Sequence, residues 1–227
     1  MKDLNKLKNK EKEKIFLNFF KTGKGEYGEG DKFLGISVPE QRKVAKKYYK
    51  DISLVEIQKL LNSKIHEHRF TALEILVMQY EIADSKNKEK IVKFYLKNTK
   101  NVNNWDLVDT SAPYILGNYL LDKGRSVLYK LAKSKDLWQK RISIISTYSF
   151  IKENDFKDTL KISEILLFDK HDLIQKAVGW MLREAGKKEE KVLISFLDKY
   201  YKKMPRTMLR YSIERLDLKQ KKFYMAK

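Results

Sequence analysis

Apolar residues recur at spacings i, i+3, i+4 and i+7 through most of the chain, which is the pattern of amphipathic helices. This pattern predicts helices over residues 4–20, 39–49, 54–61, 70–83, 89–98, 137–152 and 173–186. No stretch alternates apolar and polar residues with period two for long enough to predict a sheet, and 9 Gly and 3 Pro leave few turns for hairpins. The sequence therefore predicts an all-α protein.

Residues favoured at helix ends support several of these boundaries. Pro39 suits the first turn of a helix, where a missing N–H costs no hydrogen bond. Ser53 can cap the helix that starts at residue 54, and Gly186 suits the end of the last predicted helix. Pro113 can open another helix after a Ser or Thr cap in the segment TSAP.

Three helical segments resemble one another: SKIHEHRFTALEIL (63–76), SKDLWQKRISIIS (134–146) and KHDLIQKAVGWML (170–182). In each, a basic residue precedes a small one by three positions; the pairs are Arg69 and Ala72, Lys140 and Ser143, and Lys176 and Gly179. The basic positions are 71 and 36 residues apart, which indicates a period near 35, a middle unit near 104–105 and a degenerate unit around 208–216. Such a period is typical of HEAT or tetratricopeptide solenoids. The alternative is chance similarity among amphipathic helices.

These repeats predict a right-handed α-solenoid of HEAT-like or tetratricopeptide-like helix pairs that forms a single domain over residues 1–227. An N-terminal helix and glycine-containing loop would occupy 1–38, helical repeats 39–216 and a C-terminal tail 217–227. Residues at the same phase of successive units line one surface of a solenoid. We therefore expect Trp105, Arg141 and Trp180 to converge on one face, the concave one.

The charge balance indicates the kind of partner. The 227 residues include 49 Lys and Arg against 30 Asp and Glu, a net charge of +19, which favours nucleic acid or an anionic membrane surface. The alternative is that lysine serves as a general solubilising residue. No apolar run reaches the roughly 20 residues that a membrane span needs, and the N-terminal segment lacks the apolar core of a signal peptide. We expect a cytoplasmic protein without a membrane partner, associated with the nucleoid if its polyanionic partner is nucleic acid.

Several chemistries lack the residues they need. The chain has no cysteine, which excludes disulfides, thiolate catalysis and cysteine-based zinc sites. Its three histidines, His66, His68 and His171, offer little for a metal site or a Ser-His-Asp triad. His66 and His68 are two positions apart and do not share a helix face, so we interpret them as surface or groove residues. We expect neither metal nor cofactor.

The segment GKGEYG (23–28) matches the G-x-G-x-x-G pattern, but it follows a predicted helix rather than a strand, and no Lys-Ser/Thr completes a phosphate loop. We interpret it as a flexible loop that contacts a phosphate backbone through its amides and Tyr27.

The segment WDLVD (105–109) places Trp105 and Asp109 four positions apart, on one helix face, with Asp106 near the edge of that face. Two interpretations stay open from the residues alone. Either the aspartates are caps and salt-bridge partners beside a core tryptophan, or the indole and the carboxylate form a site.

Basic residues lie beside the other tryptophans, in WQKR (138–141) and QKAVGWMLREAGK (175–187). Arginine and lysine next to aromatic rings suit phosphate contact combined with stacking on sugar or base. The alternative is lysine side chains that snorkel on solvated faces. The candidates for contact with nucleic acid are Arg42, Lys140, Arg141, Lys176, Arg183 and Tyr27.

Four segments in order, GDKFLGISVP, NNWDLVDTSAPYILG, WQKRISI and IQKAVGWMLREAGK, resemble the AlkD-type DNA alkylation repair proteins over residues 27 to 215. The resemblance implies a HEAT-like solenoid that cradles duplex DNA in a basic concave groove. It also implies a monomeric, monofunctional glycosylase that releases cationic N3- and N7-alkylated purines.

The resemblance also assigns residues. It implies that Asp109 is the catalytic carboxylate, that Trp105 and Trp180 contact the sugar, and that Arg141 contacts the DNA backbone. Asp106 is then structural. One departure is Asn104, where some members carry a second tryptophan. The alternatives are a non-catalytic nucleic-acid-binding paralogue and a protein–protein scaffold; a base-release assay separates the first from a glycosylase, and a duplex-binding titration separates the second.

Overall fold

The computed structural model describes residues 1–226, which are helical throughout apart from loops and one isolated bridge between Lys32 and Ile65. The all-α prediction is confirmed. The chain divides into two compact units, Met1–Ser111 and Ala112–Lys227, and each is described by itself. That the chain is a single repeat domain stays a prediction.

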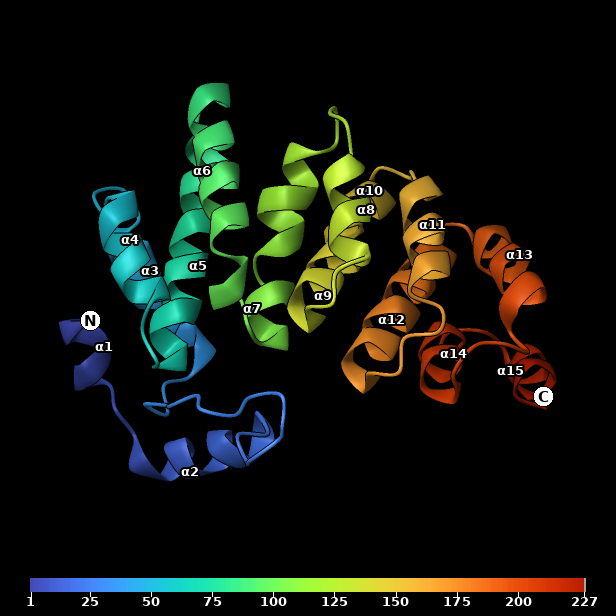
Figure 1. Ribbon diagram of the computed structural model, residues 1–227, viewed down its shortest axis with the longest axis horizontal. Coiled ribbons are helices and arrows are strands. Elements are labelled where there is room, and N and C mark those ends of the chain that lie inside the picture. Colours follow the sequence, from blue (N-terminus) through green and yellow to red (C-terminus); the bar gives the residue numbers. More distant parts are fainter. Residues whose placement is uncertain (227) are drawn as a thin grey trace. The chain divides into compact units, whose positions relative to one another are not determined.

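The first unit contains helices α1 (Lys2–Lys6), α2 (Lys10–Phe19), α3 (Val38–Tyr48), α4 (Leu54–Leu61), α5 (His66–Ile82), α6 (Ser85–Lys97), η1 (Thr99–Asn101) and α7 (Trp105–Asp109). Helix α5 is the centre of this unit, because it packs against α3, α4, α6 and α7 (Figure 1). Its apolar side chains Leu73, Ile75 and Leu76 are at most 1% exposed.

A buried carboxylate fixes the loop before α3 to helix α5. Glu67, 1% exposed, accepts hydrogen bonds from the backbone N–H groups of Leu34, Gly35 and Ile36, at 2.8 to 3.2 Å. Gly35 has φ +76°, and a Cβ there would lie 2.1 Å from the carbonyl oxygen of Asn9. Gly35 therefore has a backbone conformation that any other residue type at this position could adopt only with strain.

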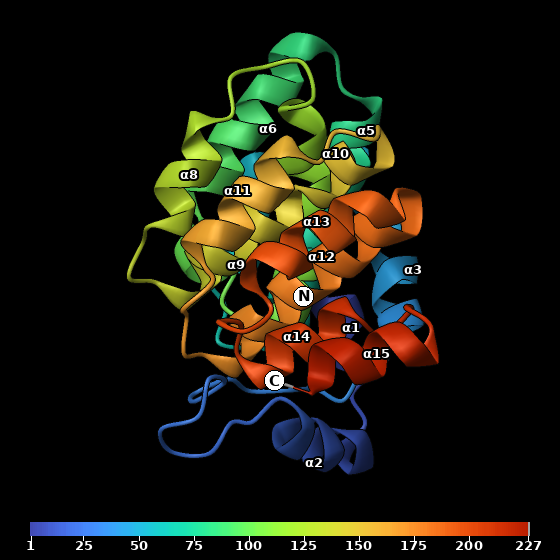
Figure 2. The same cartoon turned by 90° about the vertical axis from the view of Figure 1, so that its right-hand side faces the viewer.

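The second unit contains η2 (Pro113–Gly117), α8 (Ser126–Ala132), α9 (Leu137–Ser146), α10 (Tyr148–Lys152), α11 (Lys157–Ile165), α12 (Asp172–Lys188), α13 (Glu190–Tyr200), α14 (Arg206–Ser212) and α15 (Leu218–Met225). Helix α12 packs against α9, α10, α11, α13 and α14. Figure 2 shows α14 beside α15 near the C-terminus. The segment predicted as a tail therefore contains a helix, which Asp217 caps.

Two predicted helices are each broken in two. The helix expected over 4–20 stops after Lys6, and Asn9 starts α2 by accepting hydrogen bonds from the backbone N–H groups of Glu11 and Lys12. The helix expected over 137–152 is interrupted at Thr147. There the hydroxyl of Thr147 donates to the carbonyl of Ile144, three residues back. Polar side chains that bond the local backbone compete with helix continuation.

The predicted helix ends have mixed outcomes. Pro39 lies in the first turn of α3, and Ser53 caps α4 in a capping box with Glu56, as expected. The prediction that Gly186 ends its helix is wrong, because α12 continues to Lys188. A Cβ at Gly186 would lie 2.5 Å from Cδ2 of Leu193, so this glycine permits close packing of α13.

The start of the second unit also differs in part from expectation. Pro113 opens η2, but the residue before it is Ala112 and no Ser or Thr side chain caps the helix. The hydroxyl of Ser111 instead donates to the carbonyl of Leu107, inside the preceding turn.

The helix starts agree with the predicted repeat. Helices α5, α7, α9 and α12 begin at residues 66, 105, 137 and 172, which are 39, 32 and 35 residues apart. The small residues permit close approach: the hydroxyl of Ser143 donates to the carbonyl of Leu128 at 2.7 Å. A Cβ at Gly179 would lie 2.5 Å from that of Tyr211. Assignment to the HEAT type, the handedness and a basic concave groove stay predictions.

Candidate active site

The candidate site is built on α7, a helix of five residues. Asn104 starts it, because its Oδ1 accepts the backbone N–H of Trp105 at 2.8 Å. Leu107 and Val108 are fully buried and pin the helix to the first unit. Trp105 and Asp109, one helical turn apart, are both half-buried. The short helix thus presents an indole and a carboxylate at the protein surface.

Aromatic side chains from the end of α2 support the indole of Trp105. The ring of Phe20 stacks on it at 5.6 Å between centroids and 20° between planes. Phe19 approaches it edge-on, at 5.9 Å and 71°. Phe20 is buried, whereas Phe19 is 58% exposed. Trp105 therefore has a fixed orientation and lies beside an exposed aromatic ring.

The second aspartate of the motif has structural contacts. Oδ2 of Asp106 lies 2.8 Å from Nε2 of His66, and its Oδ1 accepts the backbone N–H of Leu107. Asp106 thus ties α7 to α5, in agreement with the structural role expected for it.

His66 and Asp106 belong to a buried charge cluster, which also includes Asp31 and Arg69. Nδ1 of His66 lies 3.1 Å from Oδ2 of Asp31, and a guanidinium N–H of Arg69 donates to Oδ1 of Asp31 at 2.7 Å. Burial alone would lower the pKa of His66, but the carboxylates of Asp106 and Asp31 outweigh it and raise that pKa to about 9. The pKa of Asp31 is lowered, because bonds to His66 and the charge of Arg69 outweigh its burial.

The interpretation of His66 and His68 as surface or groove residues is wrong. Their exposed fractions are 2% and 3%. Nδ1 of His68 lies 2.9 Å from the hydroxyl of Ser63. Burial lowers the pKa of His68 to about 4, and the nearby charge of Arg69 adds to this. Two neighbouring histidines on one helix therefore differ in charge at neutral pH.

Two features bear on Asp109: the buried phenol of Tyr95, and the hydrogen bonds of Glu74, which connect the end of α7 to α3. Burial raises the pKa of Tyr95, the negative charge of Asp109 adds to this, and the hydroxyl of Tyr95 lies 3.1 Å from that of Ser111. Next to Asp109, the hydroxyl of Thr110 donates to Glu74, and Glu74 accepts Nε of Arg42 at 3.2 Å. The side chain of Arg42 is 57% exposed. A basic side chain predicted to contact DNA therefore lies next to the C-terminal end of α7.

The glycine loop differs from expectation in how its amides are used. The N–H groups of Gly23 and Gly25 donate to the carboxylates of Glu26 and Glu29 at 2.8 and 2.7 Å. To contact a phosphate, these two amides would have to release the carboxylates that they already bind. Tyr27 is half-buried, and its hydroxyl lies 3.5 Å from the carbonyl oxygen of Phe19. Its contact with DNA stays a prediction.

In the second unit, helix α12 carries Trp180 and Arg183. The indole N–H of Trp180 donates to Glu184 at 3.2 Å, and the ring lies 6.2 Å from that of Tyr148. Arg183 pairs with Glu214, and its Nε lies 3.7 Å from Glu184. Trp180 is half-buried, so its position is compatible with a contact to a ligand.

The other basic candidates of the second unit have structural contacts. Arg141 is 5% exposed and donates to the carbonyl of Leu173, at the start of α12, at 2.6 Å. Lys140 donates to Asp169 at 2.7 Å, and Nζ of Lys176 lies 2.6 Å from Asp172. The DNA-binding role of all three stays a prediction.

The predicted site residues fall in different units. Trp105, Asp109, Arg42 and Tyr27 belong to the first unit; Trp180, Arg141, Lys140, Lys176 and Arg183 belong to the second. Their convergence on one face stays a prediction. The supporting residues that the sequence did not reveal are Phe19, Phe20, Asp31, His66 and Glu74. The Phe-Phe pair before the glycine loop was a visible signal, but no spacing linked it to Trp105.

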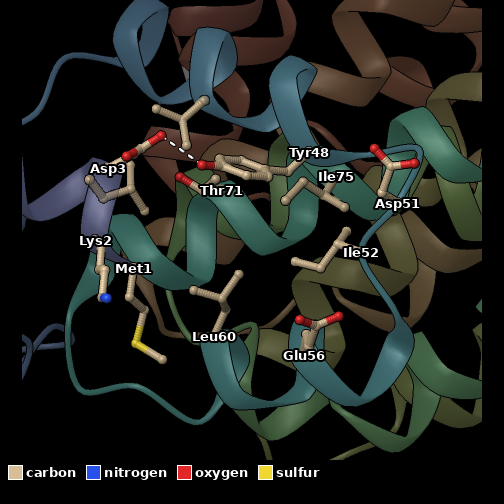
Figure 3. Close-up of a pocket in the computed structure, with 12 residues that line it drawn as sticks. Met1, Lys2, Asp3, Tyr48, Asp51, Ile52, Glu56, Leu60, Thr71 and Ile75 are labelled. Atoms are coloured by element: carbon tan, nitrogen blue, oxygen red, sulfur yellow. Dashed lines mark hydrogen bonds between the residues drawn. The ribbon is translucent and has the colours of Figure 1, made fainter.

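A cavity of the first unit is separate from α7. It has a volume of about 410 Å³ and is lined by residues of α1, α3, α4 and α5 and of the segment after α3, with no α7 residue among them (Figure 3). Asp3, one of its acidic side chains, already accepts hydrogen bonds from Lys47 and Tyr48, both at 2.7 Å. The candidate site is therefore a surface feature rather than this cavity.

Residues 1–226 contain neither a metal-binding cluster nor a membrane-spanning helix. No group of three or more His, Asp or Glu in that range is arranged to hold a metal ion. Within the same range, no helix is both long and apolar enough to cross a membrane.

The chain as a whole matches a known family of DNA repair proteins. The family model described as DNA alkylation repair enzyme matches residues 1–216, so the chain belongs to this family. Its role lies in DNA alkylation repair, as the resemblance implied, and DNA is the partner that this family suggests.

Among solved structures, a predicted DNA alkylation repair enzyme from Enterococcus faecalis is similar in fold. Its TM-score is 0.72, and the match covers 93% of this chain and 97% of that chain at 15% sequence identity. At that identity the likeness shows the fold. No curated protein matches the chain.

Proposed function

We propose that this protein is a monofunctional DNA glycosylase that releases cationic N3- and N7-alkylated purines from duplex DNA. One observation supports the proposal above others. Trp105 and Asp109 lie one turn apart on α7, both half-buried, in a member of the DNA alkylation repair enzyme family. Asp109 is the proposed catalytic carboxylate, and the indoles of Trp105 and Trp180 would contact the sugar.

The proposed glycosidic bond cleavage suits a site with few acid–base residues. A purine alkylated at N3 or N7 carries a positive charge and leaves as a neutral base, so the leaving group needs no proton. As the bond between C1′ and the base nitrogen breaks, the deoxyribose acquires oxocarbenium character. The residues required are those that stabilise a cation and position a water molecule.

The carboxylate of Asp109 can supply much of that stabilisation. A carboxylate about 4 Å from a unit positive charge gains roughly 4 kcal/mol at an effective dielectric constant of 20. At about 1.36 kcal/mol per tenfold in rate, this is roughly a thousandfold. The gain accelerates the reaction only as far as the attraction is stronger in the transition state than in the bound substrate.

Asp109 can also orient the attacking water. The water oxygen forms the new bond to C1′ as the base departs with the bonding electrons, and the carboxylate accepts a proton from that water. The faces of aromatic rings attract cations, so Trp105, held by Phe20 at 5.6 Å, would stabilise the sugar cation from a fixed position.

Basic side chains must offset the repulsion between Asp109 and the DNA phosphates. The net charge of +19 supplies a general attraction. We propose that Arg42, Lys140, Arg141, Lys176, Arg183 and Tyr27 contact the duplex. Arg42 is the best supported in the first unit, since its side chain is 57% exposed and connects through Glu74 to the residue after Asp109.

The decisive experiment is single-turnover release of 7-methylguanine from an alkylated duplex by Asp109→Asn. We expect the rate constant to fall about 100- to 1,000-fold, because the charge that stabilises the sugar cation is removed, with duplex affinity nearly unchanged. Asp122→Asn is the matched control, since the side chain of Asp122 is 81% exposed and lies outside α7.

Other results would favour the alternatives. Release at the wild-type rate by Asp109→Asn would contradict the assigned role. A wild-type protein that binds the duplex but releases no base would be a non-catalytic nucleic-acid-binding protein. A protein that does not bind duplex DNA at moderate salt would be a scaffold.

A further inference from the structure

His66 has a carboxylate at each ring nitrogen. The two contacts are 3.1 Å from Nδ1 to Asp31 and 2.8 Å from Nε2 to Asp106. An ionised carboxylate only accepts hydrogen bonds, so both nitrogens must donate and the ring must be an imidazolium. A buried histidine therefore carries a full positive charge directly under the helix that holds Asp109.

The buried charge cluster is balanced. The charged groups that face His66 are Asp31 from the loop before α3, Arg69 from its own helix and Asp106 from α7. Two carboxylates thus meet two cations, and the four side chains are between 2% and 13% exposed. If the imidazole lost its proton, one of the two carboxylates would lose its donor in a site with little water.

The imidazole ring of His66 also supports Trp105 through aromatic contacts. Its centroid lies 4.7 Å from that of Phe33, nearly parallel, and 4.8 Å from that of Phe20. Phe20 in turn stacks on Trp105. His66 therefore contacts both the carboxylate of Asp106 and the ring of Phe20, on which the indole of Trp105 rests.

A helix as short as α7 depends on such contacts. Five residues are fewer than an isolated helix needs to persist in water, so tertiary contacts must set the direction of α7. Asp106 lies between Trp105 and Asp109 on that helix, and its bond to His66 is its charged link to α5.

We propose that His66 is the positioning residue of the site: its imidazolium holds Asp106 and Phe20, and thereby fixes the directions in which Trp105 and Asp109 point. The inference deepens the proposed function and rests on it for its consequence on base release. The placement of α7 itself can be measured without any activity.

The first test compares base release with duplex affinity. We expect His66→Gln, which keeps one donor but no charge, to lower the single-turnover rate constant for 7-methylguanine about 100-fold, the cost of misplacing a reacting group by about 1 Å. The Kd for an unmodified duplex should change less than about threefold. Asp106→Asn should behave similarly, and it serves as the second variant if His66→Gln fails to fold.

His68→Gln is the matched control. His68 is as buried as His66, on the same helix, but its ring bonds Ser63 rather than α7. A wild-type rate for His66→Gln or for Asp106→Asn would overturn the inference, and so would an equal loss for His68→Gln. A loss confined to the variants of His66 and Asp106 would support it.

The second test follows the environment of the Trp105 indole by fluorescence. With Trp138→Phe and Trp180→Phe in place, fluorescence comes from Trp105 alone. We expect its emission to shift as the pH rises through about 9, where His66 loses its proton, and the shift should be absent in His66→Gln. Emission that does not respond to pH would overturn the inference.

This second readout separates the inference from the proposed function. Absence of base release by the wild-type protein, together with the fluorescence transition in the variant whose only tryptophan is Trp105, would contradict the glycosylase proposal and uphold the positioning role. Base release without the transition would do the reverse.

Discussion

Helix α7, which carries Trp105 and Asp109, has five residues, whereas helix α12, which carries Trp180 and Arg183, has seventeen. The short helix is held by the buried charge cluster and an aromatic stack. The long one packs its own apolar face against five other helices and has ion pairs on its polar side, among them Lys176 with Asp172.

The difference concerns where each tryptophan obtains its orientation. Trp180 lies in the middle of a helix that its own hydrogen bonds and packing maintain, and its N–H donates to Glu184, one turn away. Trp105 is the first residue of its helix and rests on Phe20, a residue far away in the chain. The geometry of α7 should therefore be sensitive to distant substitutions, and that of α12 should be tolerant.

The largest effect should follow from breaking the buried charge cluster. Arg69→Met leaves Asp31 with one cation fewer in a site where both side chains are less than 10% exposed. Breaking such a pair costs about 3–5 kcal/mol of unfolding free energy. Lys176→Met, which removes an exposed pair one turn apart on α12, should cost at most about 0.5 kcal/mol.

Urea unfolding of both variants measures this contrast. Similar losses for the two would show that the buried charge cluster below α7 and the ion pairs of α12 contribute equally to stability, and would contradict the expected sensitivity of α7.

The next effect is a pH dependence with a defined sign. The pKa of His66 rises from its ordinary 6.5 to about 9 in the folded chain. Its stabilisation is therefore fully present below pH 6.5 and is lost as the pH rises through about 9. We expect the difference in unfolding free energy between wild type and His66→Gln to shrink by roughly 2–3 kcal/mol from pH 7 to pH 10. Taking this difference removes the lysines and tyrosines that titrate in both proteins.

His68 gives the opposite sign and checks the assignment. Its pKa is lowered to about 4, so its stabilisation is present above pH 6.5 and is lost as the pH falls towards 4. If the difference in unfolding free energy between wild type and His66→Gln grew as the pH rose above 7, the imidazolium assignment would be wrong.

A smaller effect should come from the packing of α12. A Cβ at Gly179 would lie 2.5 Å from that of Tyr211 and 2.6 Å from the carbonyl oxygen of Met208, so Gly179→Val must displace α14. We expect a loss of about 2 kcal/mol. At Gly124 a Cβ meets nothing within 4 Å, and Gly124→Ala should change stability by less than about 1 kcal/mol. Thermal unfolding of the two variants is the measurement, and equal melting temperatures would contradict the role of Gly179.

Much of the fold could be predicted because its signals are local. The apolar period predicted α4 to the residue, and helix-end chemistry located the starts of α3 and α4. Helix α13 was missed although its signal was present, since Leu193, Phe196 and Leu197 recur at helical spacing and are buried. Helices α8 and α11, of seven and nine residues, were also missed.

The breaks within predicted helices were harder to predict. Thr147 is compatible with a helix by propensity, and the break between α9 and α10 is marked by the hydrogen bonds that its backbone N–H and its hydroxyl both donate to the carbonyl of Ile144. Gly186 was mistaken for a helix end because a glycine needed for close packing cannot be distinguished, in sequence, from one needed for a left-handed turn.

The site was predictable only in part. The four-residue spacing of Trp105 and Asp109 on α7 was visible in the sequence, and so was the excess of basic residues. The partners of His66 were not, because Asp31 and Asp106 lie 35 and 40 residues away along the chain. No helical period relates positions so far apart.

The sequence by itself determined the helical class, the approximate spacing of the repeating helices and the pairing of an indole with a carboxylate on one turn. Hydrogen bonds within a few residues and the apolar period decide these features, and both are properties of neighbouring positions. Only the tertiary structure decided that Asp106 is an anchor and that His66 is charged while His68 is neutral. Burial and the charge of contacting groups set these states, and both depend on residues that folding brings together.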